Sequence, residues 1–178
     1  SRSEAESPLL HDWNHVFMVY CDGGYFSGSG NDVVTEDGGR RLHFRGAHIL
    51  DAVLTELAAT RGLRNATDVI LGGCSAGGIA TFLHADWVAS HPSISPSARF
   101  SGFPQSGYFP NRGVMDKWMH FQHNVMNISG VVNSKCQAFH HNKPETCIYE
   151  DVVAPFVSTP LFLWQSATDA DQLGGDAL

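Results

Sequence analysis

A serine flanked by glycines is the strongest chemical signal in the chain. Gly73-Cys-Ser-Ala-Gly77 has the G-x-S-x-G pattern of a nucleophile elbow. The apolar run 69–71 predicts a buried parallel strand before it, and residues 79–90 predict a helix after it. Ser75 would then lie on the tight turn between them, where glycines tolerate strained dihedrals and let strand and helix approach. The pattern predicts a nucleophilic Ser75, with an ordinary glycine-rich turn as the alternative.

An aspartate downstream of Ser75 has the position expected for the acid of a catalytic triad. Residues 159–165 predict a strand, and Asp169 lies on the loop that follows it. In the α/β-hydrolase fold the chain order is serine, acid and histidine, and the acid follows a late strand. Asp169 is therefore the candidate acid. Asp171 is its competitor, and a turn-forming role is the alternative reading.

A glycine-rich loop in the first part of the chain is the candidate substrate-binding segment. The apolar run 16–20 predicts a strand buried on both faces, and the loop 22–32 follows it. Open α/β sheets place binding sites at such strand ends. Because no Gly-Lys-Ser/Thr follows, the loop does not have the spacing of a phosphate loop. A simple connection is the alternative. The candidate substrate-binding residues are Asp22, Gly23, Tyr25 and Phe26.

Apolar periodicity supplies the elements that must position these groups. Residues 45–61 predict a helix with one apolar stripe, and Gly62 follows its end. Residues 98–103 predict a further short strand. The order strand, helix, strand, elbow and helix predicts an α/β fold with a parallel sheet flanked by helices. The aromatic and Met-rich segment 118–128 is expected in the core, with an acyl pocket wall as the alternative.

Length and charge restrict the class of protein. The chain has 178 residues, of which 43% are hydrophobic, so one globular domain is expected at residues 13–178 after a polar leader at 1–12. The net charge of −7, without a basic block, argues against nucleic acid as a partner. No apolar run reaches the roughly 18 residues of a membrane span, and residues 1–7 lack the apolar core of a signal peptide. A monomer is expected.

Cysteines and sequons indicate an oxidising compartment. Cys136 and Cys147 bracket a polar loop, a spacing that fits a short disulfide-closed loop. The sequons at Asn65 and Asn127 would permit glycosylation in a secreted protein. Together these features favour the secretory pathway. Cys21 and Cys74 are expected to behave as small buried hydrophobes.

Several segments together resemble one enzyme family. The resemblance covers most of residues 13–172 and is to the pectin acetylesterase and Notum family of carboxylesterases. The segments that carry it are Val19-Tyr-Cys-Asp-Gly-Gly-Tyr-Phe-Ser-Gly28, Leu42-His-Phe-Arg-Gly-Ala47, Leu71-Gly-Gly-Cys-Ser-Ala-Gly-Gly78, Ser106-Gly-Tyr-Phe109, Thr159-Pro-Leu-Phe-Leu163 and Ser166-Ala-Thr-Asp169.

The resemblance implies a secreted serine carboxylesterase of α/β-hydrolase fold that needs no metal or other cofactor. It makes Ser75 the nucleophile, the Ala76 N–H an oxyanion donor, Asp169 the acid, and Cys136 with Cys147 a disulfide. Plant-like members remove acetyl groups from pectin, and the Notum branch removes a fatty acyl group from Wnt proteins. An acetyl ester on a polysaccharide is the expected substrate. A lipid ester on a protein and a non-catalytic binding protein of the same fold are the alternatives.

The chain departs from the family pattern in four ways. Residues 1–14 do not resemble the family's Gly-Gly-Gly-Trp-like oxyanion loop, and no histidine follows Asp169. Gln105 stands where the family usually has Asp, and Asp171 stands where pectin acetylesterases tend to have Trp. The sequence is therefore expected to be an internal piece of a longer enzyme, with the domain incomplete at both ends and inactive by itself.

None of the ten histidines of this chain is expected to act as the missing base. His43 lies before the first predicted helix, and His84 lies within the second, so surface or packing roles are expected for both. His140 and His141 could suggest a metal site, but no third ligand with suitable spacing accompanies them.

Overall fold

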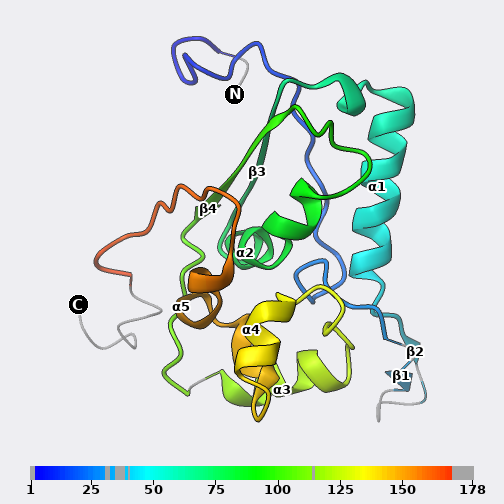
Figure 1. The fold of residues 1–178 in the computed structure, drawn as a ribbon, viewed down its shortest axis with the longest axis vertical. Helices are drawn as coiled ribbons and strands as arrows, with labels where there is room; N and C mark the ends of the chain where they lie inside the picture. The colour runs from blue at the N-terminus through cyan, green and yellow to red at the C-terminus, as the bar shows by residue number, and fades with distance from the viewer. Residues whose placement is uncertain (1–2, 31–32, 35–38, 40, 114, 170–178) are drawn as a thin grey trace.

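The computed structural model describes residues 3–30, 33–34, 39, 41–113 and 115–169 (Figure 1). Asp171 and the rest of 170–178 lie outside the described residues. The α-helices and β-strands in chain order are β1 (Val33–Val34), β2 (Arg41–Leu42), α1 (Gly46–Thr60), β3 (Asp68–Cys74), α2 (Ala76–Ala89), β4 (Arg99–Gln105), α3 (Asp116–Asn124), α4 (Ser134–Phe139) and α5 (Glu150–Val153). Short 3-10 helices occupy Leu63–Asn65, Pro144–Ile148 and Ala154–Phe156.

A parallel sheet forms the centre of the fold. β3 pairs with β4 in register from Asp68 opposite Arg99 to Cys74 opposite Gln105, and α2 is the crossover between them. The predicted elbow strand, its helix and the strand at 98–103 are thus confirmed. This arrangement brings the carboxyl ends of both strands to one edge of the sheet.

The predicted strand at 159–165 forms only in part. Leu161 and Trp164 make isolated parallel bridges to Gly102 and Gln105, and the residues between them run extended beside β4. Pro160 and Pro104 have no N–H to donate, which leaves gaps in the ladder. The segment still continues the sheet beyond β4 and places its own carboxyl end at the same edge.

α2 is the buried axis of the molecule. Its buried side chains include Ile79, Phe82, Leu83 and Val88, which occur on more than one side of the helix, as expected for a helix packed on several sides.

α1 has a narrower apolar stripe. Leu50 and Leu54 are buried against Val88, whereas Ile49 is 37% exposed. In Figure 1, α1 runs beside the sheet, and α3, α4 and α5 gather below α2.

The predicted strand at 16–20 is wrong. Among the described residues no backbone hydrogen bond involves this segment, and Phe17 is 89% and Val19 70% exposed. Only Met18 packs against a core cluster. A strand requires a hydrogen-bonding neighbour, so an apolar run without one in the described part of the chain stays extended but unpaired.

The buried-cysteine prediction is also wrong, since Cys21 and Cys74 are both exposed. Side chains alternate along β3, so Cys74 shares the open face of the sheet with Ile70, which is 41% exposed. The predicted strand 69–71 is therefore covered on one face only. The opposite face carries Val69 and Leu71 toward the core that Val88 of α2 and Leu50 of α1 form.

The disulfide prediction is confirmed. Cys136 of α4 and Cys147 are bonded and fully buried, and they pack in the same core cluster as Met119, Met126 and Ile128. Met119, Met126 and Ile128 of the segment 118–128 thus lie in the core, as predicted, whereas Trp118 and Val125 are 39% and 37% exposed. The bond ties α4 to the residues just before α5.

Candidate active site

Ser75 adopts the backbone conformation of a nucleophile elbow. Its φ is 55° and its ψ is −116°, a region that side chains other than glycine's rarely occupy. The residue lies between the last residue of β3 and the first of α2, and its side chain is exposed. The turn predicted from the G-x-S-x-G pattern is confirmed, and it presents the Ser75 hydroxyl to solvent at the sheet edge.

Glycines make this turn sterically possible. A Cβ on Gly73 would lie 2.4 Å from the Gly77 carbonyl oxygen, and one on Gly78 would lie 2.6 Å from the Gly107 Cα. Both distances are shorter than real Cβ contacts, so each close approach requires glycine. A Cβ on Gly77, by contrast, would meet nothing within 4 Å. The prediction that small residues are required around Ser75 therefore holds for Gly73 and Gly78.

Backbone hydrogen bonds fix the elbow to β4 and to its own helix. The Ser75 N–H donates to the Gln105 carbonyl at 2.9 Å, and the Ser75 carbonyl accepts from Gly78 N–H at 2.8 Å. As the first residue of α2, Ala76 has an N–H that no carbonyl of this helix can accept. This N–H lies at the positive end of the helix dipole, which suits a donor to an oxyanion.

Asp169 lies at the same edge of the sheet. Cys74 pairs with Gln105, and Gln105 bridges to Trp164, so the residues after all three segments lie side by side. The Ser106 N–H donates to the Trp164 carbonyl at 2.8 Å, which fixes the last of these segments. The half-buried Asp169 accepts a 2.8 Å hydrogen bond from Gln165 Nε2.

Gln165 is a residue that sequence reasoning missed. Its Oε1 accepts the Tyr108 N–H at 3.1 Å, so one side chain joins Asp169 to the loop after β4. An isolated glutamine at the end of a strand has no spacing signal that would have revealed this role. The pattern marked Asp169 only because triad acids follow late strands.

The side chains of the loop 22–26 mainly support the fold. Asp22 Oδ1 accepts from the N–H groups of Gly24 and Phe26, both at 3.3 Å. Tyr25 is only 7% exposed, and its hydroxyl accepts a hydrogen bond from Trp118 Nε1 at 3.2 Å. Gly23, Tyr25 and Phe26 all have positive φ, so the loop is tightly turned. Substrate binding by these residues stays a prediction.

His84 has the packing role predicted for it. The side chain is 2% exposed, and its Nε2 lies 2.8 Å from the Tyr25 carbonyl oxygen. Because a carbonyl can only accept, Nε2 carries the proton of the neutral ring. Burial lowers the pKa of His84 to about 4, an effect that the Tyr25 hydrogen bond partly opposes. This histidine is therefore uncharged at neutral pH and holds the loop 22–26 on α2.

Three other histidines hydrogen-bond to partners away from the nucleophile. His91 pairs with Asp51 at 3.0 Å, and His120 and His123 bond to Asn124. Within the described residues, no histidine hydrogen-bonds to Ser75 Oγ. In the same part of the chain there is also no group of three His, Cys, Asp or Glu that could hold a metal ion.

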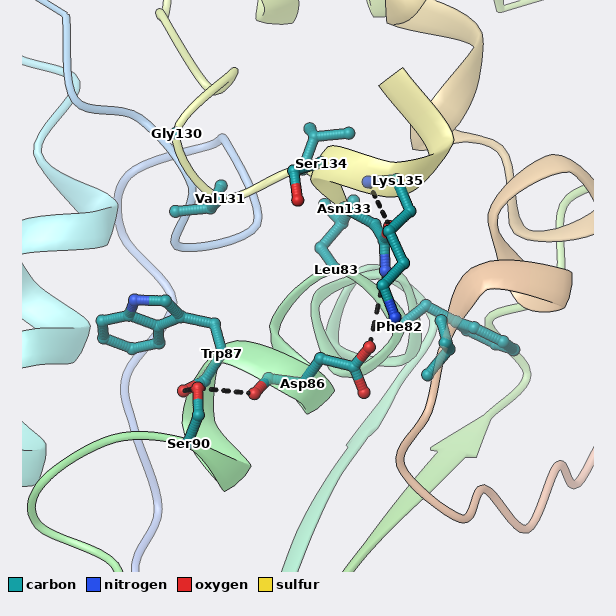
Figure 2. A pocket seen from close by; sticks show the side chains of 12 residues that line it. Phe82, Leu83, Asp86, Trp87, Ser90, Gly130, Val131, Asn133, Ser134 and Lys135 are labelled. Atoms are coloured by element: carbon teal, nitrogen blue, oxygen red, sulfur yellow. Dashed lines mark hydrogen bonds between the residues drawn. The ribbon is translucent and has the colours of Figure 1, made fainter. Parts of the chain in front are cut away.

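A pocket of about 260 Å³ lies away from the elbow, against the second half of α2 (Figure 2). Figure 2 shows Trp87, Asp86 and Lys135 among its lining side chains. Asp86 accepts hydrogen bonds from the Ser158 and Thr159 N–H groups and from Asn133, so its carboxylate is used by the fold. At a rise of about 1.5 Å per residue, Asp86 lies roughly 16 Å along the helix from Ser75. The pocket is therefore no part of the candidate active site.

A strained serine elbow between a parallel strand and a helix, with an aspartate after a later strand, defines the α/β-hydrolase class. The family model described as Pectinacetylesterase matches residues 1–177, and the chain belongs to this family. Among curated relatives, Pectin acetylesterase 5 of Arabidopsis thaliana is 34% identical over 97% of the chain and 40% of its own length.

The palmitoleoyl-protein carboxylesterase NOTUM of Drosophila melanogaster is 28% identical over 96% of the chain and 27% of its own length. A solved structure of the Wnt deacylase Notum from Drosophila superposes with a TM-score of 0.83 at 26% identity. It covers 97% of this chain and 52% of that one. The α/β-hydrolase fold predicted from the sequence is thus confirmed, and the chain spans less than half the length of these two curated relatives.

Proposed function

We propose that this chain carries the nucleophile and the acid of a serine carboxylesterase. Ser75 Oγ attacks the ester carbonyl, and a histidine that follows the acid in the family order takes its proton. Asp169 holds that imidazole in the correct tautomer, and the Ala76 N–H stabilises the tetrahedral oxyanion. Collapse of this intermediate breaks the substrate's ester bond, and the alcohol leaves with the proton that the histidine took. Water, with its proton accepted by the same histidine, then hydrolyses the acyl ester on Ser75. The observation that carries the proposal is the strained, solvent-facing turn at Ser75, with Asp169 at the same sheet edge.

We propose an O-acetyl group on pectin or a similar polysaccharide as the substrate. The identity of 34% to Pectin acetylesterase 5, against 28% to the Drosophila NOTUM, supports the acetyl ester. The likeness to the Drosophila Wnt deacylase keeps a fatty acyl ester on a protein as the second candidate. Comparing turnover of p-nitrophenyl acetate and p-nitrophenyl palmitate would separate them, since a pocket shaped for acetate rejects a long chain.

The nucleophile can be tested directly with a fluorophosphonate probe on the protein expressed from its full coding sequence. Mass spectrometry should find the adduct on the peptide that contains Ser75. Ser75→Ala should abolish labelling, whereas Ser97→Ala, at an exposed turn serine that precedes β4, should not change it. A folded wild-type protein that takes no label at Ser75 would instead indicate a binding protein of hydrolase fold.

Two exposed sequon asparagines and a disulfide support a secreted protein. Asn65 and Asn127 are both exposed, as glycosylation requires, and the Cys136–Cys147 disulfide suits an oxidising environment. Secretion with glycans at these two asparagines is therefore proposed. Treatment of the protein from its native host with a peptide N-glycosidase would lower its mass if they are occupied. No helix in the described part of the chain is long and apolar enough to cross a membrane.

A further inference from the structure

The geometry points to Gln165 as the positioning residue of the acid, an inference that rests on the proposed esterase function. Its amide bridges two groups that lie 61 residues apart in sequence. Gln165 Nε2 donates to Asp169 Oδ2 at 2.8 Å, and Gln165 Oε1 accepts the Tyr108 N–H at 3.1 Å. We propose that this bridge holds the Asp169 carboxylate in the orientation in which it can receive the imidazole of the triad.

The chemistry of the two partners fixes the orientation of the amide. A backbone N–H can only donate, so the Gln165 atom that faces Tyr108 must be the oxygen. The NH₂ group then faces Asp169, and an ionised carboxylate is the acceptor that suits it. A carboxylate has about four lone-pair sites, so Asp169 keeps the capacity to accept a further hydrogen bond from an imidazole N–H.

Gln165 is itself held firmly where this bridge needs it. The preceding residue, Trp164, donates its N–H to the Pro104 carbonyl at 3.1 Å and accepts from the Ser106 N–H at 2.8 Å. Gln105, next in β4, accepts the Ser75 N–H through its carbonyl. The amide of Gln165 therefore extends from the same hydrogen-bonded sheet edge that holds the elbow. The Gln165 amide therefore links Asp169 to the loop after β4.

The experiment is a double-mutant cycle in the full-length enzyme. Gln165→Leu removes both hydrogen bonds and should lower kcat about 10- to 100-fold with little change in KM, the scale expected for a misplaced catalytic group. If Gln165 acts through Asp169, Gln165→Leu should reduce the remaining rate of an Asp169→Asn enzyme by less than about threefold. Equal reductions in the two backgrounds, or an unchanged kcat in folded Gln165→Leu, would overturn the inference.

Gln165→Glu separates the two halves of the bridge. It keeps an acceptor for the Tyr108 N–H, so hydrogen exchange at that amide should stay slow, whereas Gln165→Leu should accelerate it. It also replaces the donor to Asp169 with a second carboxylate, and like charges raise the pKa of one of the pair. The acid limb of the pH–rate profile should therefore move to higher pH. An acid limb that does not move would count against the proposed contact with Asp169.

These readouts keep the inference separate from the proposed function. A wild-type enzyme that neither hydrolyses esters nor takes the probe would refute the esterase function, and with it this inference. An active enzyme with an additive cycle would refute only the role of Gln165. Unchanged exchange at the Tyr108 amide in Gln165→Leu would contradict the bridge itself, whatever the protein catalyses.

Discussion

Glu150 Oε2 accepts a hydrogen bond from the Phe109 N–H at 2.8 Å, inside the fold and with no side-chain exposure. Phe109 belongs to the loop after β4 whose Gly107 packs on Gly78 of the elbow. Burial raises the pKa of Glu150 to about 8, although the Phe109 N–H opposes the shift by favouring the charged form. This carboxyl group is therefore mostly protonated at neutral pH, and a buried, neutral acid holds the loop beside Ser75.

The raised pKa makes folding stability depend on pH. Between the ordinary glutamate pKa of 4.5 and about 8, the folded state holds a proton that the unfolded state releases. Stability from this residue is therefore present below about pH 4.5 and lost as the pH rises toward 8. Glu150→Gln keeps the acceptor for Phe109 without a titrating group. In urea unfolding, the free energy of unfolding of the variant should rise relative to that of wild type between pH 5 and pH 8, by a few kcal/mol at most. Parallel pH curves would contradict this account.

Substitutions at two neighbouring glycines should differ sharply. Gly78→Ala places a Cβ 2.6 Å from the Gly107 Cα and 2.9 Å from the Gln105 carbonyl oxygen, both rigid backbone atoms. Overpacking of this kind costs about 1–3 kcal/mol or more. Gly77→Ala meets nothing within 4 Å and is the matched control, with stability equal to wild type or slightly higher. Chemical denaturation of the two variants measures the difference, and equal midpoints would refute the steric argument.

The buried disulfide should contribute substantially to stability. Cys136 and Cys147 are 11 residues apart and bond in the same core cluster as Met119 and Met126. Replacing both with alanine frees a short loop in the unfolded chain and should cost about 2–4 kcal/mol. Cys21→Ser, at an exposed free thiol, serves as the control and should leave the unfolding midpoint unchanged. A double variant as stable as wild type would show that core packing alone suffices.

Ser75 itself should be replaceable with a gain in stability. A residue with a side chain at φ 55° and ψ −116° carries strain of about 1–3 kcal/mol. Glycine relieves that strain but gains about 0.5–1 kcal/mol of unfolded-chain entropy, so Ser75→Gly should be more stable by about 1 kcal/mol. Ser75→Ala keeps the Cβ and should show no such gain. Urea titrations of both variants would test this, and equal stabilities would mean that the turn is unstrained.

Elements fixed by local sequence could be predicted well. The apolar stripe of 45–61 became α1, and glycines marked the turn at Ser75 because a Cβ on Gly73 or Gly78 would overlap neighbouring backbone. The order of acid after nucleophile pointed to Asp169, which lies at the same sheet edge as Ser75, and its role as the acid stays a prediction. Each of these signals depends on neighbours within a few residues or on a known chain order.

Features that depend on distant partners could not be predicted. The run 16–20 has the composition of a buried strand, but pairing depends on a neighbouring strand that the run itself does not encode. Cys74 looked buried because its neighbours are apolar, whereas alternation along β3 turns it to the open face. Glu150 and Gln165 are single polar residues without a pattern. Their roles arise only when the loop after β4 folds against them.

The open face of the sheet also bears on how this protein must be handled. Phe103 contacts both Phe162 and Trp164, which are 70% and 60% exposed, and Phe17 is exposed as well. Unpaired backbone groups along such a strand can pair with another chain, and exposed aromatic side chains favour association. Salts such as sulfate strengthen apolar burial, so residues 1–178 alone should salt out early and bind hydrophobic dyes. Association and precipitation of folded chains, rather than unfolding, would then limit the concentrations at which this segment can be studied.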